Sequence, residues 1–235
     1  MPGPGSEMNL NTLRAHGYLL LLMVVLGAIV LGMTDSEFPY LREGTVTFLM
    51  AIVFVTVFDR PSYRVFSLIA GLIVLAALWL LRVAPPVQTR QLEILIHLGG
   101  TLFFALAVSM VLRHLFERRA VRIDDILGTL CGYLLAAMAW GNLFAAMSLM
   151  QPDAFFLQGV AHPDFARWHE REALFLYFSL TTITTIGYGD VTPVAPLARS
   201  AAMIEGVFGQ FYIAVVVAQL VGSKLAEVSA RDERR

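Results

Sequence analysis

The chain has 235 residues, of which 57% are apolar and only 15% are charged, and its formal net charge is −1 at pH 7. A soluble domain carries about 25% charged residues, so this composition indicates a membrane protein and excludes an ordinary soluble domain. The near-neutral charge argues against nucleic acid as a partner. The single cysteine, Cys131, allows no internal disulfide and no cysteine-based metal site, and we expect it to be a buried packing residue.

Seven apolar runs predict an all-α membrane protein with six transmembrane helices. A helix needs about 20 residues to cross the hydrocarbon core, within a range of roughly 17–25. The sixth run is too short to cross, so we expect a re-entrant half-helix there, followed by a loop and the last crossing. The seven runs are 17–33, 44–58, 65–83, 94–116, 123–150, 172–184 and 197–222.

The order of these runs divides the chain into four parts. Residues 1–16 are expected to form a short cytoplasmic N-terminus, within which residues 1–7 have the composition of a cloning remnant. Residues 17–116 hold the first four crossings, which we expect to form a peripheral four-helix bundle. In residues 117–222 two crossings flank the re-entrant helix, and residues 223–235 are expected to form a short cytoplasmic tail.

The polar stretch 151–171 is expected to be a solvated loop on the outer face, because its histidines and acids lack metal-ligand spacing. Basic residues set the orientation, since cytoplasmic loops carry an excess of them. Placing both termini in the cytoplasm puts most of them inside, so we expect a multi-pass protein of the plasma (inner) membrane. One inner cluster is either a positive-inside flank or a site for anionic lipid headgroups; it comprises Arg113, Arg118, Arg119 and Arg122.

The residues that carry chemistry follow the re-entrant run and read Thr184-Thr185-Ile186-Gly187-Tyr188-Gly189-Asp190. A dehydrated cation needs oxygens in place of its water, and backbone carbonyls along a narrow axis can supply them. Glycine adopts the left-handed conformations that this demands, so Gly187 and Gly189 predict a ladder of carbonyls. The Thr185 hydroxyl can add one more ring of oxygens. Four chains are needed, because one strand presents its oxygens from one side only.

This stretch resembles the signature of the tetrameric potassium channels, of the six-crossing type with a voltage-sensor-like but charge-poor first half; a prokaryotic member is expected. The resemblance is close over about 123–222 and only topological before that. It implies a homotetramer in which outer helix, turret, pore helix, filter and inner helix surround a central pore. It also implies passive, selective K⁺ conduction, with no enzymatic activity and no organic cofactor. The implied selectivity filter includes Gly189, and the implied K⁺ ligands are Thr185, Ile186 (usually a valine in the family), Gly187 and Tyr188.

Four residues are expected to support this filter: Tyr177, Thr181, Thr184 and Asp190. By the resemblance, Tyr177 belongs to an aromatic cuff, and we predict that its hydroxyl bonds Asp190. Thr181 replaces a glutamate of some family members, which removes one brace. Hydroxyls cluster at the C-terminal end of the pore helix, where they can satisfy the backbone as the chain leaves helical geometry. The partial negative charge at that helix end favours a cation.

The last crossing is predicted to contain the gate. Gly209 stands at the family's hinge position and serves either as that hinge or as a close contact with the pore helix. Gly206 is expected to be a packing residue. Ile213, Val217 and Val221 recur at helical spacing and are predicted to line the cavity, with Val221 near a constriction that could gate by dewetting.

Glu205 is an acid inside this apolar crossing, where such residues usually face protein rather than lipid. We expect it to point at the back of the pore helix, either protonated or bonded to a hydroxyl such as that of Thr182 or Thr184. Its role is then a structural hydrogen bond or pH-linked gating.

Steep voltage gating is not expected, because a voltage sensor needs several arginines at every third position of the fourth crossing. That crossing is uncharged from Ile94 to Leu112 apart from His97, and Arg113 is assigned to an interfacial linker with Asp124. The stimulus is left open between pH, lipid, membrane tension and constitutive opening. Alternative functions are a weakly selective cation channel and a non-conducting regulatory subunit. The intramembrane ionisable residues are too scattered for an enzyme's active site.

Overall fold

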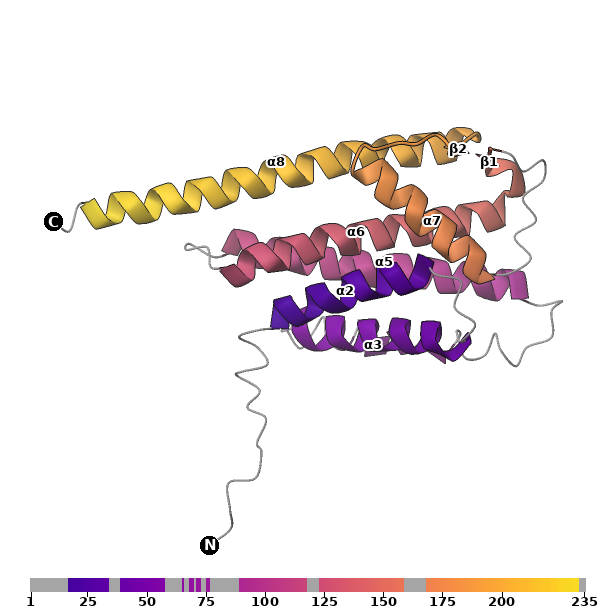
Figure 1. Ribbon diagram of the computed structural model, residues 1–235, viewed down its shortest axis with the longest axis horizontal. Coiled ribbons are helices and arrows are strands. Elements are labelled where there is room, and N and C mark those ends of the chain that lie inside the picture. The colour runs from indigo at the N-terminus through magenta and orange to yellow at the C-terminus, as the bar shows by residue number, and fades with distance from the viewer. Residues whose placement is uncertain are drawn as a thin grey trace, which may run out of the picture.

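The computed structural model describes residues 17–33, 39–57, 89–117, 123–158 and 168–232, together with residues 65, 68, 69, 71, 72, 75 and 76. In these ranges the chain is almost entirely helical (Figure 1). The elements in chain order are α2 (Gly17–Met33), α3 (Pro39–Val57), α5 (Thr89–Glu117), α6 (Ile123–Met150), the 3₁₀ turn η2 (Pro152–Ala154), β1 (Phe155–Leu157), α7 (Trp168–Ile183), β2 (Val191–Pro193) and α8 (Pro196–Asp232).

Three helices are long and apolar enough to cross a membrane, judged by length and composition within the described ranges. They contain the stretches Arg90–Glu117 in α5, Asp124–Met150 in α6 and Pro196–Gln219 in α8. The apolar parts of α2 and α3 are shorter, and the predicted crossing at 65–83 lies mostly outside the described residues. The predicted re-entrant run corresponds to α7, whose 16 residues fall below the length of a crossing. Six crossings therefore stay a prediction.

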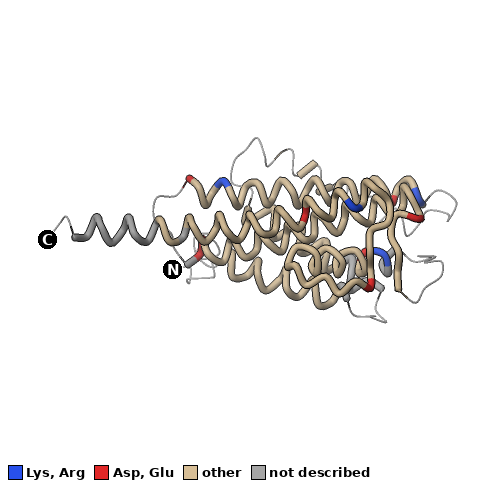
Figure 2. The backbone as a smooth tube through the Cα atoms, turned by 90° about the horizontal axis from the view of Figure 1, so that it is seen from above, with Lys and Arg blue, Asp and Glu red and all other residues tan. Residues whose placement is uncertain are grey.

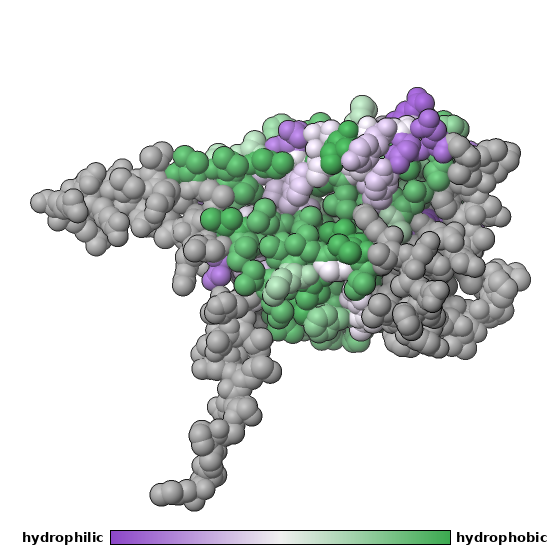
Figure 3. Space-filling model, in the orientation of Figure 1, coloured by the Kyte–Doolittle hydropathy of each residue, from purple (hydrophilic) through white to green (hydrophobic). Residues whose placement is uncertain are grey.

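The polarity of the surface fits a membrane protein. Figure 2 shows the described Lys, Arg, Asp and Glu residues mainly toward the ends of the helices. Figure 3 shows apolar side chains, in green, over the middle of the bundle, and hydrophilic ones gathered near the β1–β2 end. Water-soluble monomers rarely expose so continuous an apolar surface, whereas lipid or partner subunits would cover it.

Helix α6 is the centre of the bundle and contacts α2, α5, α7 and α8. The main hydrophobic core lies among α2, α3, α5 and α6 and includes the fully buried side chains of Val25, Leu49 and Leu135. Cys131 on α6 is also fully buried, with its thiol 3.4 Å from the Tyr18 carbonyl of α2. Its predicted packing role is confirmed.

The outer loop before α7 contains regular structure that the sequence did not predict. Strand β1 pairs antiparallel with β2, with Phe155 opposite Pro193. The Phe155 ring enters a second buried cluster, where it packs edge-to-face against Phe144, Phe175 and Phe178 at centroid distances of 5.9, 4.7 and 5.6 Å. The fold is mostly helical, as predicted, with this short ribbon as an addition. The expectation of a solvated loop is wrong for Phe155, which is buried. Three-residue strands are too short for alternation of polarity to reveal them.

Two predicted boundaries differ from the structure. Helix α8 continues to Asp232, because the residues after the predicted end at Gly222 contain no proline and many strong helix formers. Arg113 lies within α5, not in a linker, and it forms an exposed ion pair with Glu117 one turn later at 2.7 Å. Asp124 belongs to the first turn of α6, where an acid opposes the positive helix end. Three other arginines of the predicted lipid-binding cluster lie outside the described residues: Arg118, Arg119 and Arg122.

Candidate ion-conduction site

Helix α7 is held against α6 by a buried face. Phe175 and Ile183 are fully buried, and the Phe178 ring packs edge-to-face on Phe144 of α6 at 5.0 Å. At the end of the helix, the Ile183 carbonyl accepts a hydrogen bond from the Tyr133 hydroxyl of α6 at 2.7 Å. The chain that follows α7 therefore starts from a fixed point.

Hydroxyl groups satisfy the backbone where α7 ends. Thr181 and Thr182 donate to the Phe178 carbonyl at 3.0 and 2.8 Å, and Thr184 donates to the Leu180 carbonyl at 2.5 Å. These three hydroxyls therefore donate hydrogen bonds to backbone carbonyls of the preceding helical turn. The predicted satisfaction of the backbone by hydroxyls is confirmed for these three residues.

Two backbone hydrogen bonds then turn the chain back along α7. The Thr185 amide donates to the Thr182 carbonyl at 3.0 Å, and the Gly187 amide donates to the Thr181 carbonyl at 3.1 Å. The second bond joins the helix to the middle of residues 184–190, which we call the candidate filter. Thr181 thus contacts the candidate filter through its main chain rather than its side chain.

The φ angles of the candidate filter alternate between positive and negative values along the chain. Thr185, Gly187 and Gly189 have φ angles of +62°, +54° and +82°, whereas Ile186 and Tyr188 between them have negative φ. The left-handed conformation predicted for both glycines is confirmed. Thr185 was not predicted to share it, since a β-branched residue at positive φ is an outlier. Such strain costs about 1–3 kcal/mol and persists only where its surroundings impose it, so it marks Thr185 as part of the site.

The candidate filter and one face of α8 are not covered by other parts of the chain that the structure describes. Ile186 and Tyr188 are 56% and 69% exposed. Only 28% of the apolar stretch in α8 is buried, against 67% in α6. The exposed side chains of α8 include the three predicted cavity residues, Ile213, Val217 and Val221. Apolar surfaces of this kind mark contacts with other chains or with lipid.

Asp190, at the outer end of the candidate filter, is held from three sides. The Tyr177 hydroxyl of α7 donates to its carboxylate at 2.7 Å, which confirms the predicted hydrogen bond. The Val191 amide donates to the other carboxylate oxygen at 3.0 Å, and the Gln158 amide donates to the Asp190 carbonyl at 2.9 Å. The Tyr177 ring also stacks parallel to that of Tyr188 at 6.3 Å. Asp190 is therefore hydrogen-bonded both by α7 and by the backbone of the β1–β2 ribbon and its next residue, Gln158.

Replacing Tyr177 with phenylalanine keeps the ring and removes the donor to Asp190. A hydrogen bond to a charged group contributes about 1.5–3 kcal/mol, so we expect ion current to decay at least about tenfold faster during sustained conduction. Tyr212→Phe is the matched control, because its hydroxyl bonds the Thr129 carbonyl at 2.7 Å, away from the candidate filter. Decay at the wild-type rate in Tyr177→Phe would show that this bond does not support the filter.

Gly206 and Gly209 of α8 differ in their surroundings. A Cβ at Gly209 would meet the Ile183 carbonyl oxygen and would lie 2.8 Å from Ile183 Cγ1, so α8 and the end of α7 touch here. The predicted close contact with the re-entrant helix is confirmed. A Cβ at Gly206 would meet no atom of the described residues within 4 Å. The packing predicted for Gly206 is therefore not found within the subunit, because this side of α8 is uncovered.

Glu205 is completely buried and points at the back of α7, as predicted. Its partner is the Ser179 hydroxyl, so the prediction of Thr182 or Thr184 is wrong. Thr182 and Thr184 instead donate to the Phe178 and Leu180 carbonyls of α7. Ser179 lies one turn before Ile183, the residue that touches Gly209, and this helical spacing was the signal that could have identified it.

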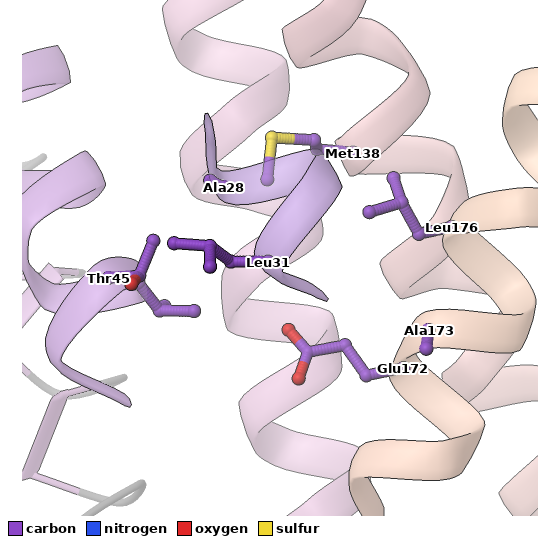
Figure 4. A pocket seen from close by; sticks show the side chains of 8 residues that line it. Ala28, Leu31, Thr45, Met138, Glu172, Ala173 and Leu176 are labelled. Atoms are coloured by element: carbon purple, nitrogen blue, oxygen red, sulfur yellow. The ribbon is translucent and has the colours of Figure 1, made fainter. Parts of the chain in front are cut away.

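A small cavity lies beside the first half of α7, between it and α2, α3 and α6 (Figure 4). Its volume is about 30 Å³, enough for a water molecule but far too small for an organic ligand. Its lining is mostly apolar, with Thr45 and Glu172 as the polar members. No group of three or more His, Cys, Asp and Glu side chains able to hold a metal ion occurs among the residues that the structure describes.

Residues 165–223 match a protein family described as ion channel. This match covers about a quarter of the chain and includes α7, the candidate filter and most of α8. A search of curated proteins finds no match to the chain. Together with the helical fold and the three apolar helices of membrane-spanning length, the family match supports a membrane protein that contains an ion channel domain.

Proposed function

We propose that the chain is one subunit of a homotetrameric, potassium-selective channel. Four copies of the candidate filter would surround a narrow axis, with K⁺ bound by the carbonyls of Thr185, Ile186, Gly187 and Tyr188 and by the Thr185 hydroxyl. The observation that carries this proposal is the alternation of positive and negative φ from Thr185 to Gly189. When residues with positive and negative φ alternate, the carbonyl groups of successive peptides point to the same side, so that their oxygens form one column.

The requirement for several subunits follows from what one subunit leaves uncovered. The candidate filter is exposed, and the carbonyls of one chain can contact an ion from one side only. The exposed face of α8 continues from this segment into the inner half of the helix. Four copies would bury both surfaces around one axis, leaving Ile213, Val217 and Val221 to line the inner cavity.

Passive conduction needs no covalent step, so the residues act by position and charge alone. K⁺ would exchange its water for carbonyl oxygens at the candidate filter, move between adjacent sites and leave on the other side. The C-terminal end of α7 stops just behind this segment, and its partial negative charge would stabilise a cation there. This chemistry is that of a transport protein and not of an enzyme.

Helix α5, the counterpart of a voltage-sensing helix, is fixed to the pore side of the molecule. Arg90 donates twice to the Leu149 carbonyl at the end of α6, at 3.0 and 2.6 Å. Glu93 pairs with Arg171 of α7 at 2.6 Å. Further along, His97 bonds the Asn142 side chain at 3.1 Å. The Thr101 hydroxyl lies 2.9 Å from the His97 carbonyl of its own helix and 3.3 Å from the Ala139 carbonyl of α6, and its single proton serves one of the two. Helix α5 cannot slide without breaking the contacts of Arg90, Glu93 and His97, which favours gating that is not strongly voltage-dependent.

Voltage ramps on the reconstituted protein test this prediction. One charge moved through a 100 mV field contributes about 2.3 kcal/mol, or roughly a 50-fold change in the open-to-closed ratio. We expect a change well below this value. Glu93→Gln should lower the free energy of unfolding by about 1–2 kcal/mol, because a neutral amide replaces the carboxylate that the largely buried Arg171 guanidinium pairs with. It should create no voltage dependence.

The matched control for that substitution is Glu117→Gln, which breaks the exposed ion pair with Arg113. Exposed pairs contribute about 0–1 kcal/mol, so its stability should stay close to that of the wild type. Steep voltage dependence of the wild-type protein would show that α5 moves despite its hydrogen bonds and its ion pair to α6 and α7.

Cation flux into liposomes tests the proposed function itself. Purified protein is reconstituted with opposed K⁺ and Na⁺ gradients, and Ba²⁺ is added as a blocker. The proposal predicts K⁺ flux that Ba²⁺ blocks and that greatly exceeds Na⁺ flux. Equal flux of both ions would indicate a weakly selective cation channel, and the absence of flux would favour a non-conducting subunit.

A further inference from the structure

The Ser179 hydroxyl lies between two oxygens on different helices. It is 2.7 Å from the Ala137 carbonyl of α6 and within hydrogen-bond distance of Glu205 Oε1 on α8. A serine hydroxyl has one proton, and a carbonyl oxygen can only accept. If Ser179 donates to Ala137, the bond between Ser179 and Glu205 must be donated by the Glu205 carboxyl group. The geometry therefore requires a protonated Glu205 for both bonds to exist together.

The surroundings of Glu205 agree with a neutral acid. The side chain is fully buried within one subunit, so neither lipid nor a neighbouring subunit can reach it. Its second oxygen, Oε2, has no hydrogen-bond partner among the described residues. A buried carboxylate without compensation is strongly unfavourable, whereas a buried carboxylic acid is tolerated. The titratable side chain that α6 presents toward Glu205 is Tyr133, which is acidic rather than basic and offers no positive charge.

We propose that Glu205 carries a proton and donates it in a hydrogen bond to Ser179, which donates in turn to Ala137, so that this relay positions α7 behind the filter. The relay crosses three helices in the order α8, α7, α6. Ser179 and Glu205 are positioning residues, since neither belongs to the candidate filter. This inference rests on the proposed function and adds to it a specific residue, Ser179, and a specific protonation state.

The relay has a defined dependence on pH. In the protonated form both hydrogen bonds of Ser179 are made. Loss of the proton turns the Ser179 hydroxyl toward the carboxylate and leaves the Ala137 bond without a donor. K⁺ flux should therefore fall as the pH rises far enough to ionise Glu205, and it should be insensitive to acidification. Glu205→Gln retains a donor toward Ser179 and cannot ionise, so its flux should not fall at alkaline pH.

Infrared difference spectroscopy on the purified tetramer tests the protonation state directly. Wild type minus Glu205→Gln at neutral pH should contain the C=O stretching band of a protonated carboxylic acid. The absence of that band would overturn the proposal, because Glu205 would then be ionised.

Flux in liposomes tests the positioning role. Ser179→Ala and Glu205→Ala each break the relay and should reduce K⁺ flux about tenfold, the effect of one lost buried hydrogen bond, while Glu205→Gln should rescue it. Ser148→Ala is the matched control, because Ser148 is a buried serine that bonds only a carbonyl of its own helix, at 2.8 Å. Wild-type flux and pH profile in Ser179→Ala would overturn the positioning role. An acid band with no flux from any protein, wild type included, would overturn the channel function and leave the protonation state established.

Discussion

Alanine at Gly187 is expected to abolish selective K⁺ flux without unfolding the protein. The φ angle of +54° places this residue in the left-handed region, where a Cβ costs roughly 1–2 kcal/mol. In a tetramer the cost is incurred four times, which amounts to about three to six orders of magnitude in the population of filters with aligned carbonyls. Within one chain space is not the obstacle, since a Cβ at this position meets no atom of the described residues within 4 Å. The loss should therefore appear in ion flux rather than in expression or thermal stability.

Gly27→Ala is the matched control for that experiment. Gly27 lies in α2, a Cβ there also meets no atom of the described residues within 4 Å, and its backbone is helical. Alanine should raise helix stability by about 1 kcal/mol and leave flux unchanged. Retention of selective flux in Gly187→Ala would contradict the role assigned to the backbone of the filter.

Alanine at Gly209 is expected to destabilise the contact between α8 and the end of α7. Its Cβ would occupy the position of the Ile183 carbonyl oxygen, which already accepts the Tyr133 hydroxyl. Overpacking of this kind costs about 1–3 kcal/mol for each subunit. We expect a lower melting temperature together with loss of flux, because the carbonyl that would move is at the start of the candidate filter.

Gly206→Ala separates packing from hinge bending. It makes the same chemical change three residues earlier, with no described atom within 4 Å of the new Cβ. If Gly209 acts only as a hinge, Gly209→Ala should melt like Gly206→Ala and differ from it in gating alone. A lower melting temperature specific to Gly209→Ala is the result that the contact predicts.

Local features of the site could be predicted because their causes lie within a few residues. The left-handed glycines follow from the conformational freedom of glycine. The Tyr177–Asp190 bond was predicted from the resemblance to the tetrameric potassium channels, which implies an aromatic cuff at Tyr177. The left-handed conformation of Thr185 could not be predicted, because it opposes the intrinsic preference of a β-branched residue. The backbone on both sides of Thr185 is held by tertiary contacts, such as the hydrogen bond from the Gly187 amide to the Thr181 carbonyl, which the sequence does not reveal.

Most side-chain partners in distant parts of the chain could not be predicted from a single sequence. Glu93 and Arg171 are 78 residues apart, and nothing local links them. The partner of Glu205 was misassigned because the hydroxyls of Ser179, Thr182 and Thr184 are chemically equivalent in the sequence. The structure distinguishes them by their hydrogen-bond partners. The β1–β2 ribbon escaped prediction for the same reason, since its register depends on how the outer loop folds back over Asp190.

The most direct test of potassium selectivity is the zero-current voltage of the reconstituted protein in a planar bilayer, with K⁺ on one side and Na⁺ on the other. Each tenfold preference for one monovalent ion shifts this voltage by about 59 mV. A potassium-selective filter should produce a shift of at least two such steps, about 118 mV, in the direction that marks K⁺ as the permeant ion. A zero-current voltage near 0 mV, with current that persists in Gly187→Ala, would contradict it.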